Sequence, residues 1–95
     1  MTIEFQTPYG KVSEKLVGMI RNALLELSHR NKKITRAEVS LMESNLGLEE
    51  NQVCEIKLNV LGKGLLAHCR TNNFATSAEQ AVRDLKKQLN LRRNK

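Results

Sequence analysis

Basic side chains recur through residues 73–95 at spacings that suit contact with an anionic partner. The apolar residues of this stretch return every three or four positions, as one buried face of a helix requires. The basic residues fall on the other face and in the tail beyond it: Arg83, Lys86, Lys87, Arg92, Arg93 and Lys95. Point charges one helical turn apart can follow a phosphate backbone, so this stretch predicts part of a polyanion-binding surface.

A second basic set lies within residues 14–33, where a first helix is expected. Lys15 and Arg21 can face outward from that helix, and Arg30 stands at its end beside Lys32 and Lys33. We predict that the following side chains contact RNA: Lys15, Arg21, Arg30, Arg83, Lys86, Lys87, Arg92 and Arg93. A merely solvated face is the alternative, because most charge runs are solvated and because carboxylates at 79 and 84 dilute the later set.

The composition agrees with a polyanionic partner and says nothing about the fold. The chain has 95 residues, enough for one domain, and 16 Lys and Arg against 10 Asp and Glu give a net charge of +6. A soluble domain that happens to be basic is the alternative. Since the sequence has no signal peptide, no membrane-spanning apolar stretch and no disulfide framework, we expect a cytoplasmic protein with reduced thiols and no membrane partner.

The sequence offers little for catalysis. His29 and His68 have no partner at a readable spacing, and Cys54 and Cys69 fall on a buried strand face, where cysteine behaves as a small hydrophobe. The chain has no phosphate-cradling glycine loop, no metal-ligand cluster and no carboxylate pair with an obvious task. We therefore expect a protein that is not an enzyme and that uses no catalytic residue, no metal, no cofactor and no small-molecule substrate.

Hydrophobic periodicity predicts an α+β domain with the element order β-α-β-β-β-α. Alternation marks strands over residues 2–7, 34–43, 52–60 and 65–71, and helical spacing marks residues 14–29 and a final helix capped by Asn72 or Asn73. The first β-α-β unit crosses over right-handed, so its strands are parallel, and the later strands join by hairpins, the second turning at Gly62–Lys63. We expect a four-stranded mixed sheet with two parallel helices packed side by side on its one apolar face.

The same pattern predicts which side chains form the core. The strands should point inward with Ile3, Phe5, Ala37, Val39, Leu41, Cys54, Ile56, Leu58, Val60, Leu65, Ala67 and Cys69. The first helix should bury a stripe of Val12, Leu16, Met19, Ile20, Ala23, Leu24 and Leu27 and leave Val17 and Leu25 partly exposed. We expect this domain to cover residues 1–91 and residues 92–95 to form a disordered basic tail.

Several of these stretches together resemble a known family, the ribosome hibernation promoting factors, also called ribosome-associated translation inhibitors or sigma-factor modulation proteins. The resemblance covers residues 2–91. It is carried by the opening strand IEFQT, by VSEKL at the start of the first helix, by the glycine turn at 62–64 and by the closing run 74–89 with its LKKQL. The chain resembles the short form of the family, without the further domain that pairs ribosomes in long members.

The resemblance implies binding in the small ribosomal subunit, in the channel that messenger RNA and the anticodon ends of transfer RNA use. Basic side chains on the two helices would grip ribosomal RNA, silence translation and preserve idle ribosomes in stationary phase or stress, and the protein would be a monomer off the ribosome. Lys87 matches a basic position of the family's closing helix. The family's usual lysines fall here on Ala23, Glu26 and Asp84, and its usual aromatic after Phe74 is Ala75.

Two other functions remain open from the residues alone. One is a general double-stranded RNA-binding module with no fixed ribosomal site. The other is a protein-interaction module whose basic helices dock an acidic partner. A steep dependence of binding on salt, of about −0.9 in the log–log slope for each phosphate contacted, would separate RNA binding from the protein module.

Overall fold

Four strands and two helices build the domain. The computed structural model describes residues 1–7, 12–43 and 51–93, with the backbone alone for 91–93. The elements are β1 (Thr2–Gln6), α1 (Glu14–Arg30), β2 (Ile34–Glu43), β3 (Gln52–Val60), β4 (Lys63–Thr71) and α2 (Phe74–Arg93). Residues 8–11, which follow the first predicted strand, residues 44–50, between the second and third predicted strands, and residues 94–95 of the predicted tail lie outside the described residues.

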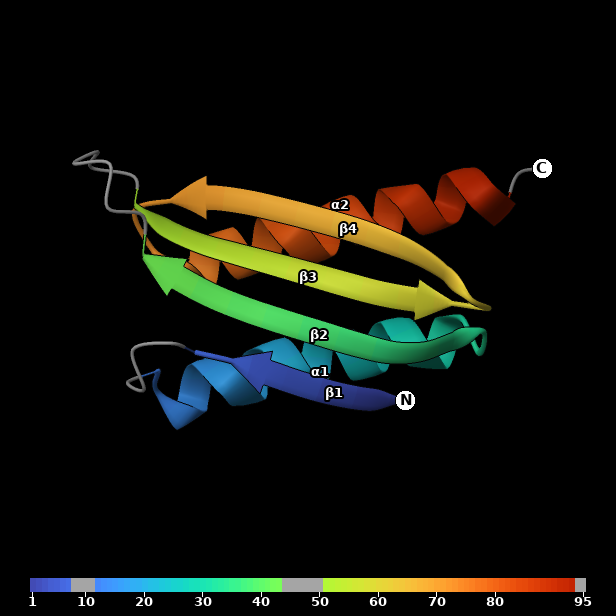
Figure 1. Ribbon diagram of the computed structural model, residues 1–95, viewed down its shortest axis with the longest axis horizontal. Helices are drawn as coiled ribbons and strands as arrows, with labels where there is room; N and C mark the ends of the chain where they lie inside the picture. Colours follow the sequence, from blue (N-terminus) through green and yellow to red (C-terminus); the bar gives the residue numbers. More distant parts are fainter. Residues whose placement is uncertain (8–11, 44–50, 94–95) are drawn as a thin grey trace.

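The strands form one mixed sheet in the order β1-β2-β3-β4. β1 runs parallel to β2, and the other neighbouring strands are antiparallel. Figure 1 shows both helices on the same side of the sheet, α1 behind β1 and β2 and α2 behind β3 and β4, running in the same direction. The predicted α+β architecture, with two parallel helices on one face, is confirmed. Neither described helix has both the length and the apolar composition needed to cross a bilayer.

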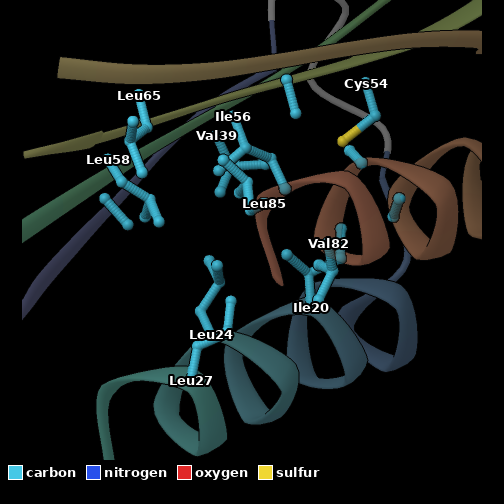
Figure 2. Close-up of a cluster of buried hydrophobic side chains, with 14 of the residues drawn as sticks. Ile20, Leu24, Leu27, Val39, Cys54, Ile56, Leu58, Leu65, Val82 and Leu85 are labelled. Carbon is cyan, nitrogen blue, oxygen red and sulfur yellow. The ribbon is translucent and has the colours of Figure 1, made fainter. Parts of the chain in front are cut away.

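The core lies between the sheet and the two helices. Val39 of β2 pairs with Ile56 of β3, and Ile56 pairs with Ala67 of β4. All three side chains are buried. Figure 2 shows how side chains of the sheet meet Leu85 of α2 and Leu24 of α1 in one cluster. The predicted inward register of β2, β3 and β4 is confirmed, because a slip of one residue would have turned these side chains to solvent.

An irregularity at the start of β2 escaped the alternation pattern. Ile34 pairs with Val60, whereas Arg36 pairs with Asn59, so Thr35 is an extra residue in β2. This β-bulge lets Ile34 and Ala37, three positions apart, both point into the core. A strictly alternating strand would have placed Ile34 on the outer face.

The turn between β3 and β4 lies one residue earlier than predicted. Val60 pairs with Lys63, so the two turn residues are Leu61 and Gly62 and not Gly62 and Lys63. Both have positive φ, 52° and 80°, as a type I′ hairpin turn requires. The turn is fixed by Asn59, whose Oδ1 accepts a hydrogen bond from the Gly62 N–H at 2.9 Å.

The helix α1 begins at Glu14, as predicted, directly after a capping serine. The Ser13 hydroxyl accepts a hydrogen bond from the Leu16 N–H at 3.1 Å, which satisfies one of the free amides of the first turn. Ile20, Leu24 and Leu27 are the fully buried residues of the predicted stripe. Met19, which we expected in the stripe, is 37% exposed at its margin, whereas Leu25 is exposed as predicted.

Polar side chains anchor the start of α2 to the sheet. The Asn73 side chain caps the helix by accepting from the Ala75 and Thr76 amides, and the Phe74 N–H donates to Oε1 of Gln52 in β3 at 2.8 Å. Ser77 is completely buried and donates from Oγ to the Gln52 carbonyl at 2.7 Å. These contacts fix the angle and position at which α2 leaves the sheet.

Candidate nucleic-acid interface

A groove runs between α1 and α2 on the helical side of the molecule. One hollow in it is lined by Ala23, Glu79, Val82, Arg83 and Lys86, and a second by Leu27, Arg30, Asn31, Lys86, Leu89 and Asn90. Lys86 lines both hollows, so they are neighbours, and we call the two together the interhelical groove. The parallel packing of the helices therefore brings together basic residues that lie more than fifty positions apart in the sequence.

The interhelical groove carries more positive than negative charge. Arg30, Arg83 and Lys86 are exposed along it, against one lining carboxylate, Glu79. Arg30 also contacts Glu26 at 3.4 Å, but both side chains are more than half exposed, at 71% and 60%. Such exposed pairs contribute about 0–1 kcal/mol, so an RNA phosphate can replace Glu26 as the partner of Arg30 at little cost.

Asp84 lies on the other flank of α2, toward β4. Gln88 donates from Nε2 to the Asp84 carboxylate at 3.3 Å and to the Leu66 carbonyl of β4 at 3.0 Å. Burial, and then the nearby Asp84 carboxylate, raise the pKa of the Cys69 thiol in the same strand. Because Asp84 faces the edge of the sheet, it does not line the interhelical groove, and it dilutes the basic surface less than its place in the sequence suggests.

The residues predicted to contact RNA do not all lie on one surface of the structure. Arg30, Arg83 and Lys86 line the interhelical groove. Lys15 and Lys87 are exposed on the helices but do not line it, and Lys87 stands one turn beyond Arg83. The side chains of Arg92 and Arg93, the last residues of α2, lie outside the described atoms.

Arg21 lies on the far side of α1, away from α2. Its guanidinium carbon is 5.5 Å from the centre of the Phe5 ring of β1, a cation–π distance. Arg21 therefore covers a core aromatic residue at the edge of the sheet. Two polar residues that we did not predict, Asn31 and Asn90, line the groove with Arg30 and Lys86 and can donate hydrogen bonds to a phosphate or a sugar.

The outer face of the sheet has a larger hollow but a different electrostatic character. This hollow, of ≈ 410 Å³, is lined by Arg36, Glu38, Lys57, Leu58, Asn59, Gly64, Leu65 and Leu66. Arg36 contacts Glu4 at 2.8 Å and Glu38 at 3.0 Å, so two carboxylates surround this one cation and the hollow offers little net positive charge beside it. The Arg36–Glu4 pair joins β2 to β1, whereas Glu38 lies in the same strand as Arg36. The interhelical groove, with its excess of cations, is the better site for a polyanion.

The cysteines lack the environment of reactive thiols. Cys54 pairs directly with Cys69 across β3 and β4, and both are free thiols. Burial chiefly, with smaller contributions from Cys69 and Glu55, raises the pKa of the Cys54 thiol from 9.0 to about 12, so it stays protonated near neutral pH. Within the described part of the chain, no group of three His, Cys, Asp or Glu side chains is placed to hold a metal ion.

Comparison with known proteins gives a family and a shared fold. Among curated proteins, none matches the sequence. A ribosomal subunit interface protein from Coxiella burnetii has a similar structure, with a TM-score of 0.82, 15% identity and 100% coverage of both chains. The N-terminal domain of Thermus thermophilus Protein Y is also similar, with a TM-score of 0.75, 18% identity, and coverage of 93% of this chain and 94% of the other. The family model described as Sigma 54 modulation protein / S30EA ribosomal protein matches residues 3–95, and the chain belongs to that family.

Proposed function

We propose that this protein binds the small ribosomal subunit and inhibits translation by occupying the channel used by messenger RNA and transfer RNA. The interhelical groove would face ribosomal RNA, with Arg30, Arg83 and Lys86 placed against phosphates. Lys15 and Lys87 would extend the contact along the outer surfaces of the helices, and Arg92 and Arg93 are proposed as further contacts at the end of the chain. The protein would act in the cytoplasm as a hibernation factor in stationary phase or stress, as a monomer when it is off the ribosome.

The observation that carries the proposal is the convergence of three cations on one groove between parallel helices. A groove lined by Arg83 and Lys86 on one side and Arg30 on the other can contact a phosphate backbone from two directions. Membership of the S30EA ribosomal protein family supports a ribosomal partner for this surface. The two similar structures, a ribosomal subunit interface protein and the N-terminal domain of Protein Y, agree with that choice.

The mechanism is occupancy and needs no catalytic step. Lysine and arginine side chains release counterions from RNA when they neutralise phosphates, and this release supplies most of the affinity. The bound domain then excludes messenger and transfer RNA from the same space. The fold contributes rigidity, because the anchored start of α2 and the capped start of α1 hold both sides of the groove in place before binding.

Co-sedimentation with whole ribosomes and with separated subunits, at two salt concentrations, tests the proposal. We expect salt-sensitive binding to the small subunit and to whole ribosomes, and loss of bound protein when messenger RNA and transfer RNA are added in excess. Binding to the large subunit alone would contradict it. Equal binding to unrelated duplex RNA would favour the general RNA-binding module, and binding that ignores salt would favour an acidic protein partner.

A further inference from the structure

The tip of the β3–β4 hairpin exposes a leucine in a backbone conformation that disfavours it. Leu61 has a φ of 52°, in the left-handed region that asparagine and glycine adopt more readily. Its side chain is 66% exposed, so it buries little apolar surface within the domain. A residue that is both strained and exposed does not serve the stability of the turn, and such outliers are reasons to look for a binding role.

The hairpin tip is joined to a second turn that is rich in lysine. The Leu61 N–H donates to the carbonyl of Lys33, in the connection between α1 and β2, at 3.3 Å. The two joined segments, residues 31–35 and 59–64, contain Lys32, Lys33 and Lys63 and no carboxylate. All three lysines are exposed. Figure 1 shows these two turns at the same end of the sheet.

Side-chain caps hold both turns rigid. The Asn31 Oδ1 accepts from the Lys33 N–H at 3.0 Å, and Asn59 holds the Gly62 amide as described above. Thr35, the bulge residue, donates from Oγ1 to the Asn59 carbonyl at 3.3 Å. The exposed leucine and the lysines around it are therefore presented on a preorganised surface, which reduces the entropy lost on binding.

This end of the molecule is continuous with the interhelical groove. Asn31 and Arg30 line the groove, and Lys32 and Lys33 follow them directly in the chain. We propose that the hairpin tip, Leu61 with Lys63, and the adjoining Lys32 and Lys33 form a second contact with ribosomal RNA, in which the lysines hold phosphates and Leu61 packs on an unpaired nucleotide between them. This inference rests on the proposed function and extends its footprint around the end of α1.

Ribosomal RNA is favoured over an acidic protein by the kinds of residue present. Lysines act as point charges toward phosphates, and the two segments offer no carboxylate that would pair with a basic residue of a protein partner. Apolar side chains such as leucine pack between or against nucleotides that are not stacked. The lysines at the hairpin tip also carry the same positive charge as Arg30 and Lys86, which line the neighbouring end of the interhelical groove.

The Leu61→Asn variant separates binding from stability. Asparagine adopts positive φ more readily, so we expect its Tm to rise by about 4 °C while its affinity for ribosomes falls about tenfold. Leu66→Thr is the matched control, because Leu66 is an exposed leucine on the outer face of the same hairpin, and its affinity should match that of the unmodified protein. If Leu61→Asn binds ribosomes as tightly as the unmodified protein does, the second contact is excluded although the proposed function stands.

A crosslinking experiment identifies the partner. We place the photoreactive amino acid benzoylphenylalanine at position 61 and irradiate the ribosome complex. The expected product is a covalent protein–RNA crosslink, which ribonuclease shortens and which leaves a peptide attached to RNA after protease treatment. A crosslink to a ribosomal protein, or no crosslink despite normal co-sedimentation, would overturn the inference. Failure of the unmodified protein to co-sediment at all would instead overturn the proposed function, and this inference with it.

Discussion

Gln88 joins Asp84 to the edge of the sheet, since its Nε2 group donates both to the Asp84 carboxylate and to the Leu66 carbonyl of β4. Asp84 is thereby held on the flank of α2 that faces away from α1. Ala23, by contrast, lines the interhelical groove directly beside Arg83 and Lys86. Positions 23 and 84 are therefore not equivalent in this fold, because only the first lines the interhelical groove.

The first prediction follows from that difference. Ala23→Lys should strengthen ribosome binding about threefold to tenfold and make the salt slope steeper by about 0.9, because it adds one phosphate contact in the groove. Asp84→Lys should change binding much less, although it reverses a charge on the same helix. Co-sedimentation over a salt series measures both. Equal gains for the two variants would show that the overall charge matters and the groove does not.

Charge reversal inside the groove should abolish binding. The double variant Arg83→Glu with Lys86→Glu removes two of the three lining cations, and we expect at least a hundredfold loss of ribosome affinity, or about 3 kcal/mol. The fold should be unaffected, because both side chains are exposed. Lys57→Glu, on the outer face of the sheet, is the matched control and should bind nearly as well as the unmodified protein. Normal sedimentation of the double variant would remove the groove from the interface.

The buried hydroxyl of Ser77 should matter for stability. Ser77→Ala leaves the Gln52 carbonyl without the hydroxyl that donates to it, and the Thr71 hydroxyl loses its 2.7 Å contact with Ser77 Oγ but keeps its bonds to Asn73. We therefore expect a loss of about 1–3 kcal/mol in the free energy of unfolding. Thr76→Ala, at the exposed neighbouring position, should cost less than about 0.5 kcal/mol. Urea unfolding of the two variants measures the difference. Similar losses would mean that these bonds do not anchor α2.

Alkaline pH should weaken the fold through Cys54. Its pKa is raised by burial from 9.0 to about 12, so above pH 9 the unfolded chain loses the thiol proton while the folded chain keeps it. The free energy of unfolding should therefore be unaffected by this group below about pH 8 and fall as the pH rises from 9 toward 12. At about pH 10.5 the contribution is about 2 kcal/mol.

Cys54→Ala isolates that contribution. The variant loses some packing at every pH, but its stability should fall less steeply than that of the unmodified protein between pH 9 and about 11. Urea unfolding at a series of pH values gives both slopes. Parallel slopes would show that Cys54 is not buried as a protonated thiol.

The alternation of apolar residues was enough to predict most of the fold. Because only one face of each strand or helix is buried, the spacing of apolar residues shows that side chains such as Ile56 and Leu85 point into the core. The bulge at Thr35 was not predictable from the sequence. Ile34 is out of phase with the inward residues Ala37 and Val39, and an apolar residue out of phase at that position is equally typical of the end of a strand. The turn was misplaced by one residue because Leu61 is an unfavourable residue for a positive φ, and the pattern favoured Gly62–Lys63.

The candidate site was less predictable than the fold. Helical spacing places Arg83 and Lys86 on a polar face, but it cannot say which edge of that face meets α1. That edge depends on the packing of Ala23 and Val82 between the helices, which alternation and charge do not encode. For the same reason the sequence did not show that Arg21, which we predict to contact RNA, lies against Phe5 on the opposite side of α1.

The parallel pairing of β1 with β2 has a consequence for the order of folding. β2, β3 and β4 are joined by connections of two to eight residues and can pair early, whereas β1 can pair only after α1 has formed and crossed the sheet. We expect native-state hydrogen exchange to protect the amides of β3 most strongly and those of β1 least. The first strand to be synthesised would then be the last to join the sheet, so the N-terminal strand completes the domain.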